Sequence, residues 1–324
     1  MKIFEKCERL DNVARAKEWG LYPYFHVLNT KQDTRVEMEG RDILMIGSNN
    51  YLGLTSDERV IRAGVEALEK YGSGCSGSRF LNGTLETHVA LEKELAAFLR
   101  KEDAVTFSTG FQSNLGIISA VAGRTDTVLC DKENHASIYD GCRLSFAKMV
   151  RYNHSDMEDL ERKLASLDLS AGGALIVTDG VFSMSGEICR LPEIVRIAKK
   201  YGAGVMVDDA HGLGVLGEGG RGTASHFGLE DEVDIYMGTF SKSLASLGVY
   251  MAANKKICEY VRHVSRPFIF SASMTPANVE CARAALGVLK REPERVSMLS
   301  EISDYMRGPV SYTHLRAHET DQYL

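Results

Sequence analysis

The stretch Val233-Asp234-Ile235-Tyr236-Met237-Gly238-Thr239-Phe240-Ser241-Lys242-Ser243-Leu244 decides the fold class, because it runs from an apolar strand directly into a lysine between hydroxyl residues. The segment Asp208-Asp209-Ala210-His211 begins 30 residues before Gly238 and follows the apolar run Val205-Met206-Val207 in the same way. In open α/β sheets, ligands bind outside the carboxyl ends of the strands. Both segments therefore predict a ligand site at one edge of such a sheet.

The side chains at these two strand ends suit one kind of ligand. A partly desolvated lysine can lose its proton and form a Schiff base with a carbonyl. The hydroxyls of Thr239 and Ser241 are sized to hold a phosphate, and the carboxylate after Val207 suits a protonated ring nitrogen. Pyridoxal phosphate combines all three groups, so we predict it as the cofactor. Ser-Lys-Ser is also common in surface loops, so other segments must support this interpretation.

Apolar runs and helical patterns alternate from residue 104 onward, which predicts βαβ units and a mostly parallel sheet flanked by helices. We expect its seven strands at 104–107, 127–130, 149–152, 174–178, 205–208, 235–238 and 249–252. Helices are expected at 111–121, 136–146, 157–167, 192–201 and 276–290, the last capped by Thr275. Before the sheet, we expect a helix over 1–20, short strands at 25–28, 36–38 and 43–46, and helices opened by Ser56 and Thr84.

Composition excludes several classes of protein. Hydrophobic residues at 44% and charged residues at 25% are typical of a globular protein, and the net charge of −6 argues against nucleic acid as the main partner. Seven scattered cysteines without Cys-x-x-Cys spacing indicate reduced thiols, and neither disulfides nor a metal site. We find no signal peptide and no apolar run of ~18–20 residues that could span a membrane. A cytoplasmic protein is expected.

Three further loops follow predicted strands and carry polar side chains. In 108–114, Gly110 and the free N–H groups of the next helix can cradle a phosphate, although a plain tight turn fits equally well. His135 begins a helix, where it either caps the helix or stacks on an aromatic cofactor. In 178–184, a hydroxyl can reach a phenolic oxygen, or Asp179 simply makes a turn.

Two segments allow a different ligand. The consecutive acids Asp208 and Asp209 could bind magnesium, although the other oxygen ligands that this ion needs are not evident. The glycine-rich run 72–79 suggests a nucleotide loop. It lies between two helices, however, and so lacks the strand that the dinucleotide motif requires. We interpret it as a flexible active-site loop.

Taken together, these segments resemble the α-oxoamine synthases, fold-type I pyridoxal phosphate enzymes that condense an amino acid with an acyl-CoA. The resemblance covers most of residues 1 to about 307. It is carried by seven motifs in order: Ser48-Asn49-Asn50-Tyr51-Leu52-Gly53-Leu54, Gly77-Ser78-Arg79-Phe80-Leu81-Asn82-Gly83-Thr84, Ser108-Thr109-Gly110-Phe111, Asn134-His135-Ala136-Ser137, Thr178-Asp179-Gly180-Val181-Phe182-Ser183-Met184, Asp208-Asp209-Ala210-His211-Gly212 and Gly238-Thr239-Phe240-Ser241-Lys242-Ser243.

The resemblance implies a fold-type I transferase with three catalytic residues. Lys242 would hold the cofactor as a Schiff base and then move the α-proton of the substrate. Asp208 would keep the pyridine nitrogen protonated, and His135 would stack on the ring and meet the substrate carboxylate.

The resemblance also implies the remaining contacts. The phenolic oxygen would be bound by Ser183 and His211, and the phosphate by Gly110, Phe111, Thr239 and Ser241. Asn50, a substrate-binding residue in this interpretation, and the stretch 271–273 would reach the site of a neighbouring subunit. A homodimer with shared active sites is therefore expected.

The choice of reaction within the family depends on one motif. Gly77-Ser78-Arg79-Phe80-Leu81-Asn82-Gly83-Thr84 with His88 resembles the bacterial serine palmitoyltransferase branch, which implies L-serine and a long-chain acyl-CoA as substrates and a 3-ketosphinganine as product. The 8-amino-7-oxononanoate synthases and glycine C-acetyltransferase are the alternatives. A catalytically silent partner subunit or a nucleotide-binding α/β module would be alternatives of another class.

The expected domain organisation follows from the same resemblance. We expect an N-terminal helix with short strands at 1–47, a large cofactor-binding α/β domain at 48–290, the start of a small C-terminal domain at 291–307, and a tail unlike the family at 308–324. A largely missing small domain would leave the helix at 275–290 exposed, with Val279, Ala282, Leu286 and Leu289 on its surface. We expect slow turnover from such a chain.

Overall fold

The computed structural model describes residues 2–310, which divide into two compact units between Ser48 and Asn49. The first unit contains a 3-10 helix, η1 (Lys2–Glu8), the helix α1 (Asp11–Glu18) and an antiparallel hairpin of β1 (Arg35–Met38) and β2 (Arg41–Leu44). The single helix expected over 1–20 is therefore wrong, because the chain breaks between η1 and α1.

A two-residue turn joins the two strands of the hairpin in the first unit. Glu39 and Gly40 connect β1 to β2 and both have positive φ angles, 52° and 75°. This conformation favours glycine and matches the right-handed twist of the two strands. The strand expected at 25–28 is reduced to one bridge, between Leu28 and Met38.

The second unit is built on a sheet that has seven strands within the described residues, in the order β3-β9-β8-β7-β6-β4-β5. The strands are β3 (Asp103–Phe107), β4 (Thr127–Asp131), β5 (Lys148–Tyr152), β6 (Ala174–Asp179), β7 (Gly204–Asp208), β8 (Ile235–Thr239) and β9 (Val249–Ala253). Only β9 runs antiparallel to its neighbours, β3 and β8. The predicted mostly parallel sheet is confirmed, with each strand within about two residues of its expected bounds.

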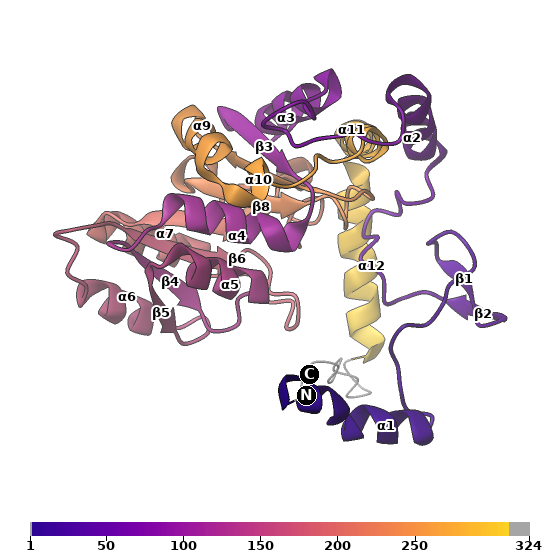
Figure 1. The fold of residues 1–324 in the computed structure, drawn as a ribbon, viewed down its shortest axis with the longest axis horizontal. Coiled ribbons are helices and arrows are strands. Elements are labelled where there is room, and N and C mark those ends of the chain that lie inside the picture. The colour runs from indigo at the N-terminus through magenta and orange to yellow at the C-terminus, as the bar shows by residue number, and fades with distance from the viewer. Residues whose placement is uncertain (1, 311–324) are drawn as a thin grey trace. The chain divides into compact units, whose positions relative to one another are not determined.

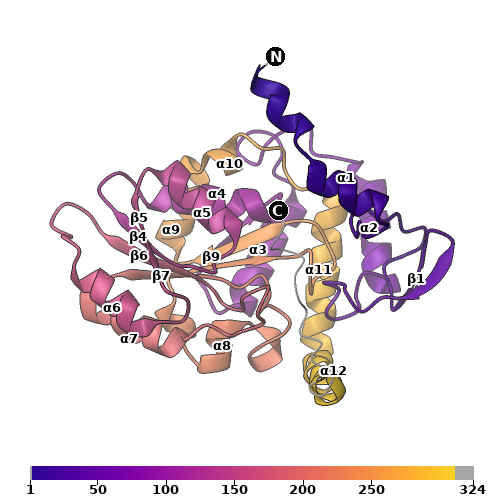
Figure 2. The ribbon, with the colours of Figure 1, turned by 90° about the horizontal axis from the view of Figure 1, so that it is seen from below.

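Helices cover both faces of this sheet (Figures 1 and 2). The helices of this unit are α2 (Glu58–Tyr71), α3 (Glu86–Phe98), α4 (Gly110–Val121), α5 (Ala136–Ser145), α6 (Met157–Ala165), α7 (Leu191–Tyr201), α8 (Thr223–Phe227), α9 (Lys255–Val264), α10 (Arg266–Ile269), α11 (Pro276–Arg291) and α12 (Glu294–Val310), with short 3-10 turns η2 (Glu218–Gly220) and η3 (Glu230–Glu232). Figure 2 shows α4 and α5 on one side of the sheet and α6, α7 and α8 on the other.

Each face of the sheet has its own hydrophobic core, because successive side chains of a strand point to opposite faces. In β7, Val205 and Val207 join one core while Met206, between them, joins the other. All three side chains are almost fully buried. Burial on both faces explains why the strands read as short continuous apolar runs in the sequence.

The helix α11 begins where it was predicted to begin, but its apolar side chains are not exposed as expected. Thr275 caps it as predicted, since its hydroxyl accepts a hydrogen bond from the N–H of Asn278 at 3.4 Å. The expected exposure of its apolar side chains is wrong, because Val279, Ala282, Leu286 and Leu289 are completely buried. The helix packs against α2 and α3 within the same unit, so these residues belong to its core.

Three smaller findings complete the fold. The cap of α2 is Asp57 and not Ser56, and α3 begins at Glu86 and not at Thr84. The last helix, α12, continues to Val310, past its expected end near 307, and the rest of the predicted tail, 311–324, lies outside the described residues. Among the helices of the described part, none has both the length and the apolar character needed to cross a bilayer.

Candidate active site

Four parallel strands, β4, β6, β7 and β8, end at the same edge of the sheet, and a cavity lies there. Its lining comprises Gly110, Phe111, His135, Ser137, Asp179, Ser183, Asp208, Ala210, His211, Met237, Thr239, Ser241 and Lys242. The structure therefore brings together every predicted cofactor-binding residue. Asn50 does not line this cavity, and its side-chain oxygen accepts a hydrogen bond from the N–H of Thr55 at 3.2 Å.

Lys242 follows β8 and reaches the cavity from a turn. Its Nζ lies 2.7 Å from Nε2 of His211. Burial lowers the pKa of Lys242, although the carboxylates of Asp208 and Asp179 act in the opposite direction. The lowered pKa increases the fraction of neutral amine, which is the form that attacks a carbonyl.

His211 is held from its other side by a residue that the sequence analysis missed. The hydroxyl of Tyr51 lies 2.7 Å from Nδ1 of His211. Burial lowers the pKa of His211 to about 4, and the nearby Lys242 and His135 contribute. His211 is therefore a neutral imidazole that lies between the phenol of Tyr51 and the amine of Lys242. Tyr51 stands in a predicted motif, but no local pattern indicates a contact across 160 residues of sequence.

The two consecutive acids after β7 point to different places. Asp208 faces the cavity and accepts hydrogen bonds from the Asn114 amide at 2.7 Å and from the N–H of Ala210 at 3.1 Å. Asp209 instead accepts from the N–H of Thr223 at 2.8 Å and from its hydroxyl at 2.6 Å, and burial raises its pKa to about 6. The divergence argues against a shared magnesium ion, since the two carboxylates cannot converge on one cation.

Glycines allow the close packing around Asp209. A Cβ atom on Gly212 or on Gly222 would overlap the Asp209 carboxylate. Gly222 also has a φ angle of 99°, in the region that side-chain-bearing residues avoid. Asp209 is therefore a buried structural anchor for the loop after β7.

Donors for an anion gather at one end of the cavity. Gly110 and Phe111 are the first residues of α4, whose leading N–H groups have no partner inside the helix. The hydroxyls of Thr239 and Ser241 lie 2.8 Å apart nearby in the same lining. Free N–H groups at a helix N-terminus together with two hydroxyls form a site that suits a phosphate.

The remaining wall carries His135, Asp179 and Ser183. The Asp179 carboxylate accepts a hydrogen bond from the N–H of His135 at 2.9 Å, a contact that the sequence analysis did not predict. Burial, and then the charge of Asp208, raise the pKa of Asp179 well above its ordinary value. The donor set thus offers a carboxylate, a lysine and phosphate donors at separate points, as a phosphorylated pyridine aldehyde requires.

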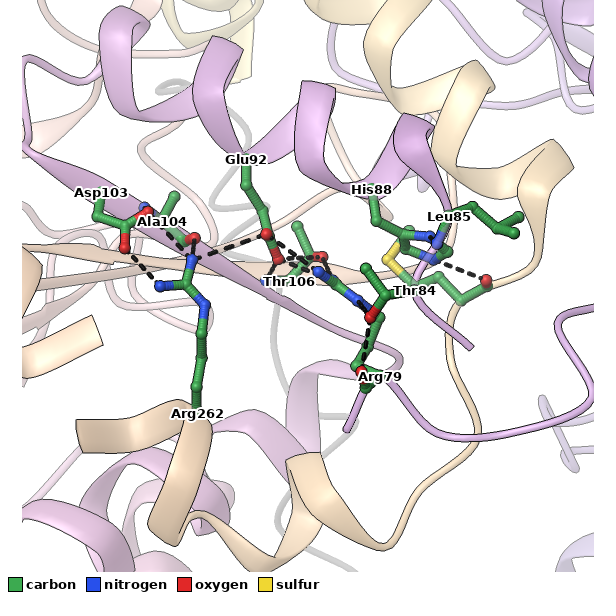
Figure 3. Close-up of polar contacts among 10 residues, drawn as sticks. Arg79, Thr84, Leu85, His88, Glu92, Asp103, Ala104, Thr106 and Arg262 are labelled. Atoms are coloured by element: carbon green, nitrogen blue, oxygen red, sulfur yellow. Dashed lines mark hydrogen bonds and ion pairs between the residues drawn. The ribbon is translucent and has the colours of Figure 1, made fainter. Parts of the chain in front are cut away.

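The glycine-rich segment 72–79, which we expected to be a flexible active-site loop, contributes none of the described residues that line this cavity. Arg79 at its end has only 8% of its side chain exposed and lies 2.8 Å from Glu92, with a further hydrogen bond of 2.8 Å to Thr106 (Figure 3). Of its glycines, Gly77 serves close packing, because a Cβ on Gly77 would overlap the side chain of Asn82 and a Cβ on Gly83, just beyond the segment, would overlap the Gly77 carbonyl oxygen.

With this geometry in place, the relationship to known proteins can be stated. Residues 41–315 match the aminotransferase class I and II family.

This chain belongs to the aminotransferase class I and II family.

Within this family, the similar proteins are α-oxoamine synthases, so the predicted resemblance is confirmed. The chain is 54% identical over 301 residues to a serine palmitoyltransferase of Bacteroides thetaiotaomicron, which covers 93% of this chain and 76% of the relative. It is 49% identical over 273 residues to an 8-amino-7-oxononanoate synthase of Geobacter sulfurreducens, covering 84% of this chain and 70% of that one.

The structure of a serine palmitoyltransferase variant from S. paucimobilis with a bound PLP–myriocin aldimine superposes with a TM-score of 0.93 at 38% identity. The superposition covers 97% of this chain and 79% of that one. The predicted fold-type I transferase fold is thereby confirmed for this family member.

Proposed function

We propose that this protein is a pyridoxal phosphate-dependent α-oxoamine synthase that condenses L-serine with a long-chain acyl-CoA and releases CoA and CO₂. The observation that carries the proposal is the placement of Lys242, Asp208 and the hydroxyls of Thr239 and Ser241 around one cavity. The similarity to serine palmitoyltransferases at 54% identity supports the choice of substrates. An 8-amino-7-oxononanoate synthase, supported by relatives at 49% identity, is the second candidate.

The residues present fit the cofactor. When bound, pyridoxal phosphate supplies an aldehyde that captures amines and a protonated ring that withdraws electrons from the substrate α-carbon. Asp208 accepts two N–H donors and lines the cavity, so its carboxylate can hold a protonated ring nitrogen. Gly110, Phe111, Thr239 and Ser241 would hold the phosphate.

Three other residues would act around the reacting atoms. Lys242 would bind the cofactor aldehyde in the resting enzyme and, once displaced by the substrate amine, would take the α-proton at Nζ. Neutral His211 and Ser183 would hold the phenolic oxygen. His135 would contact the ring and bind the substrate carboxylate, as the family resemblance implies, because it lines the same cavity as Asp208 and Lys242.

We also propose a homodimer with shared sites and a cytoplasmic location. Among the described residues, neither Asn50 nor the stretch 271–273 lines this chain's own cavity. Both would instead reach the active site of a second copy, as the family resemblance implies. All seven cysteines are free thiols, and a reducing compartment keeps them so.

A two-stage experiment tests the proposal. Purified protein is incubated with pyridoxal phosphate, reduced with borohydride and digested, and the peptide that carries Lys242 should contain the cofactor. The unreduced protein is then offered serine, alanine or glycine with palmitoyl-CoA or pimeloyl-CoA while CoA release is followed. Serine with palmitoyl-CoA should be the best pair. Alanine with pimeloyl-CoA would favour the second candidate, and an unlabelled Lys242 peptide would leave only a cofactor-independent module.

A further inference from the structure

Asp208 and His135, both in the cavity wall, are connected by a buried polar chain that neither the motifs nor the comparisons assign. Asn114 on α4 is completely buried, and its Nδ2 lies 2.7 Å from Oδ2 of Asp208 and 2.9 Å from Oγ of Ser137. The Ser137 hydroxyl in turn lies 2.7 Å from Nδ1 of His135. Four side chains from β7, α4 and α5 thus form one connected path.

The direction of each hydrogen bond in this path follows from the donors available. An ionised carboxylate only accepts, so the Asn114 amide must turn its N–H₂ group toward Asp208, and the second N–H then points at Ser137. The amide oxygen of Asn114 is buried and has no hydrogen-bond partner in the described part of the chain. A flipped amide would turn this oxygen, which cannot donate, toward the Asp208 carboxylate, so the two N–H bonds determine how the amide is oriented.

The next two steps assign the protons of His135. Since the Ser137 oxygen accepts from Asn114, its own hydrogen is free to point at Nδ1 of His135. The backbone N–H of Ser137 also donates to this nitrogen, at 3.3 Å. Two donors therefore converge on Nδ1, and in a neutral imidazole the proton must then be on Nε2.

We propose that Asn114 and Ser137 are positioning residues that leave Nδ1 of His135 as an acceptor and fix the imidazole proton on Nε2. His135 then presents a hydrogen-bond donor to the cavity, suited to an anionic group such as a carboxylate. In the opposite tautomer, the Nδ1 proton would face the backbone N–H of Ser137, and one of these buried donors would lose its acceptor. The tautomer itself follows from these contacts alone, whereas the donor's use on an amino-acid carboxylate rests on the proposed function.

Nitrogen NMR of the cofactor-free protein tests the tautomer without any activity measurement. Protein labelled with ¹⁵N-histidine is compared with a His135→Gln sample, which assigns the His135 signals among the nine histidines. We expect Nδ1 at the position of an unprotonated nitrogen and Nε2 at that of a protonated one. The reverse pattern in the unmodified protein would overturn the proposal.

Variants of two serines on α5 make the test specific. Ser137→Ala removes the hydroxyl donor and should move the Nδ1 signal toward that of a mixture of tautomers, while Ser137→Thr should restore it. Ser145→Ala is the matched control, because Ser145 is also buried but donates to the carbonyl of Cys142 at 2.7 Å. Equal His135 spectra for Ser137→Ala and the unmodified protein would refute the role of the hydroxyl.

A second measurement separates this inference from the proposed function. Serine binding to the cofactor-loaded protein should weaken about tenfold in Ser137→Ala, the loss expected for one hydrogen bond to a charged group. An altered tautomer with unchanged serine affinity would overturn the donor role of His135. Failure of the proposed function would instead appear as absent CoA release in the unmodified protein, whatever its His135 spectrum.

Discussion

Replacing Glu92 by alanine should lower the free energy of unfolding by about 3–5 kcal/mol, because the change leaves the Arg79 guanidinium buried without its counter-ion. The side chains of Arg79 and Glu92 are only 8% and 6% exposed, and their nearest charged atoms are 2.8 Å apart. Glu92 also accepts the backbone N–H of Thr106 at 2.8 Å and its hydroxyl at 2.9 Å, so alanine would leave these donors unpaired as well (Figure 3).

The same helix provides a matched control. Glu94 pairs with Arg283 at 2.7 Å, but their side chains are 36% and 27% exposed, so water screens the pair. Glu94→Ala should therefore cost no more than about 1 kcal/mol. The double variant Arg79→Leu/Glu92→Leu should recover part of the loss, because it removes both charges together.

Urea unfolding followed by far-ultraviolet circular dichroism measures these differences. Domains of this kind have a total stability of about 5–15 kcal/mol, so the Glu92→Ala midpoint should fall by a large fraction of its value. Equal midpoints for Glu92→Ala and Glu94→Ala would refute the argument that burial decides the cost. A double variant as unstable as Glu92→Ala would refute the role of the uncompensated Arg79.

Three further outcomes follow from the described contacts. Lys242→Ala should abolish covalent attachment of the cofactor after borohydride reduction, as measured by mass spectrometry, and should leave the urea midpoint almost unchanged by circular dichroism. Attachment at another lysine would contradict the assignment of Lys242. Leu286→Ala should cost about 2–5 kcal/mol, since its side chain is completely buried in α11, whereas Leu247→Ala, with 53% exposure, should cost far less by urea unfolding. Burial lowers the pKa of His88 to about 4, below its ordinary 6.5, so its contribution to stability is present above pH 6.5 and is lost as pH falls toward 4. Urea midpoints of the unmodified protein should therefore fall more steeply over this range than those of His88→Gln, and parallel pH profiles would contradict this account.

The strand ends of the site could be predicted from the sequence because each functional residue follows its own strand. Asp208 comes directly at the end of β7, and Lys242 stands three residues after the end of β8. Apolar runs mark such strands, and parallel strands bring their carboxyl ends to one edge. Local order along the chain was therefore sufficient to place these two side chains in one cavity.

Residues that act from outside these strand ends could not be predicted in the same way. Tyr51 and Asn114 contact His211 and Asp208 across 160 and 94 residues of sequence. Neither stands at a strand end, and an asparagine inside an apolar helix carries no signal of its partner. Such contacts depend on tertiary packing, which a single sequence does not encode locally.

Glycine content alone does not show how the segment before α3 is used. A run of glycines predicts flexibility when only the backbone is considered, but glycine also allows atoms to approach where a Cβ would not fit. Gly83 packs against the Gly77 carbonyl in this way, and the segment ends in the buried Arg79. The sequence shows the glycines without showing which of these two properties is used.

The divergence of Asp208 and Asp209 explains how a cavity lined by acids can still favour a neutral lysine. Neighbouring residues at the end of a strand point to opposite faces, so only Asp208 of the pair reaches the cavity. Asp209 is bonded to Thr223 instead, away from the cavity. Of the effects on Lys242, desolvation outweighs the charges of Asp208 and Asp179 and lowers the lysine pKa. The same burial that stabilises the strand ends thus prepares the amine for attack on a carbonyl.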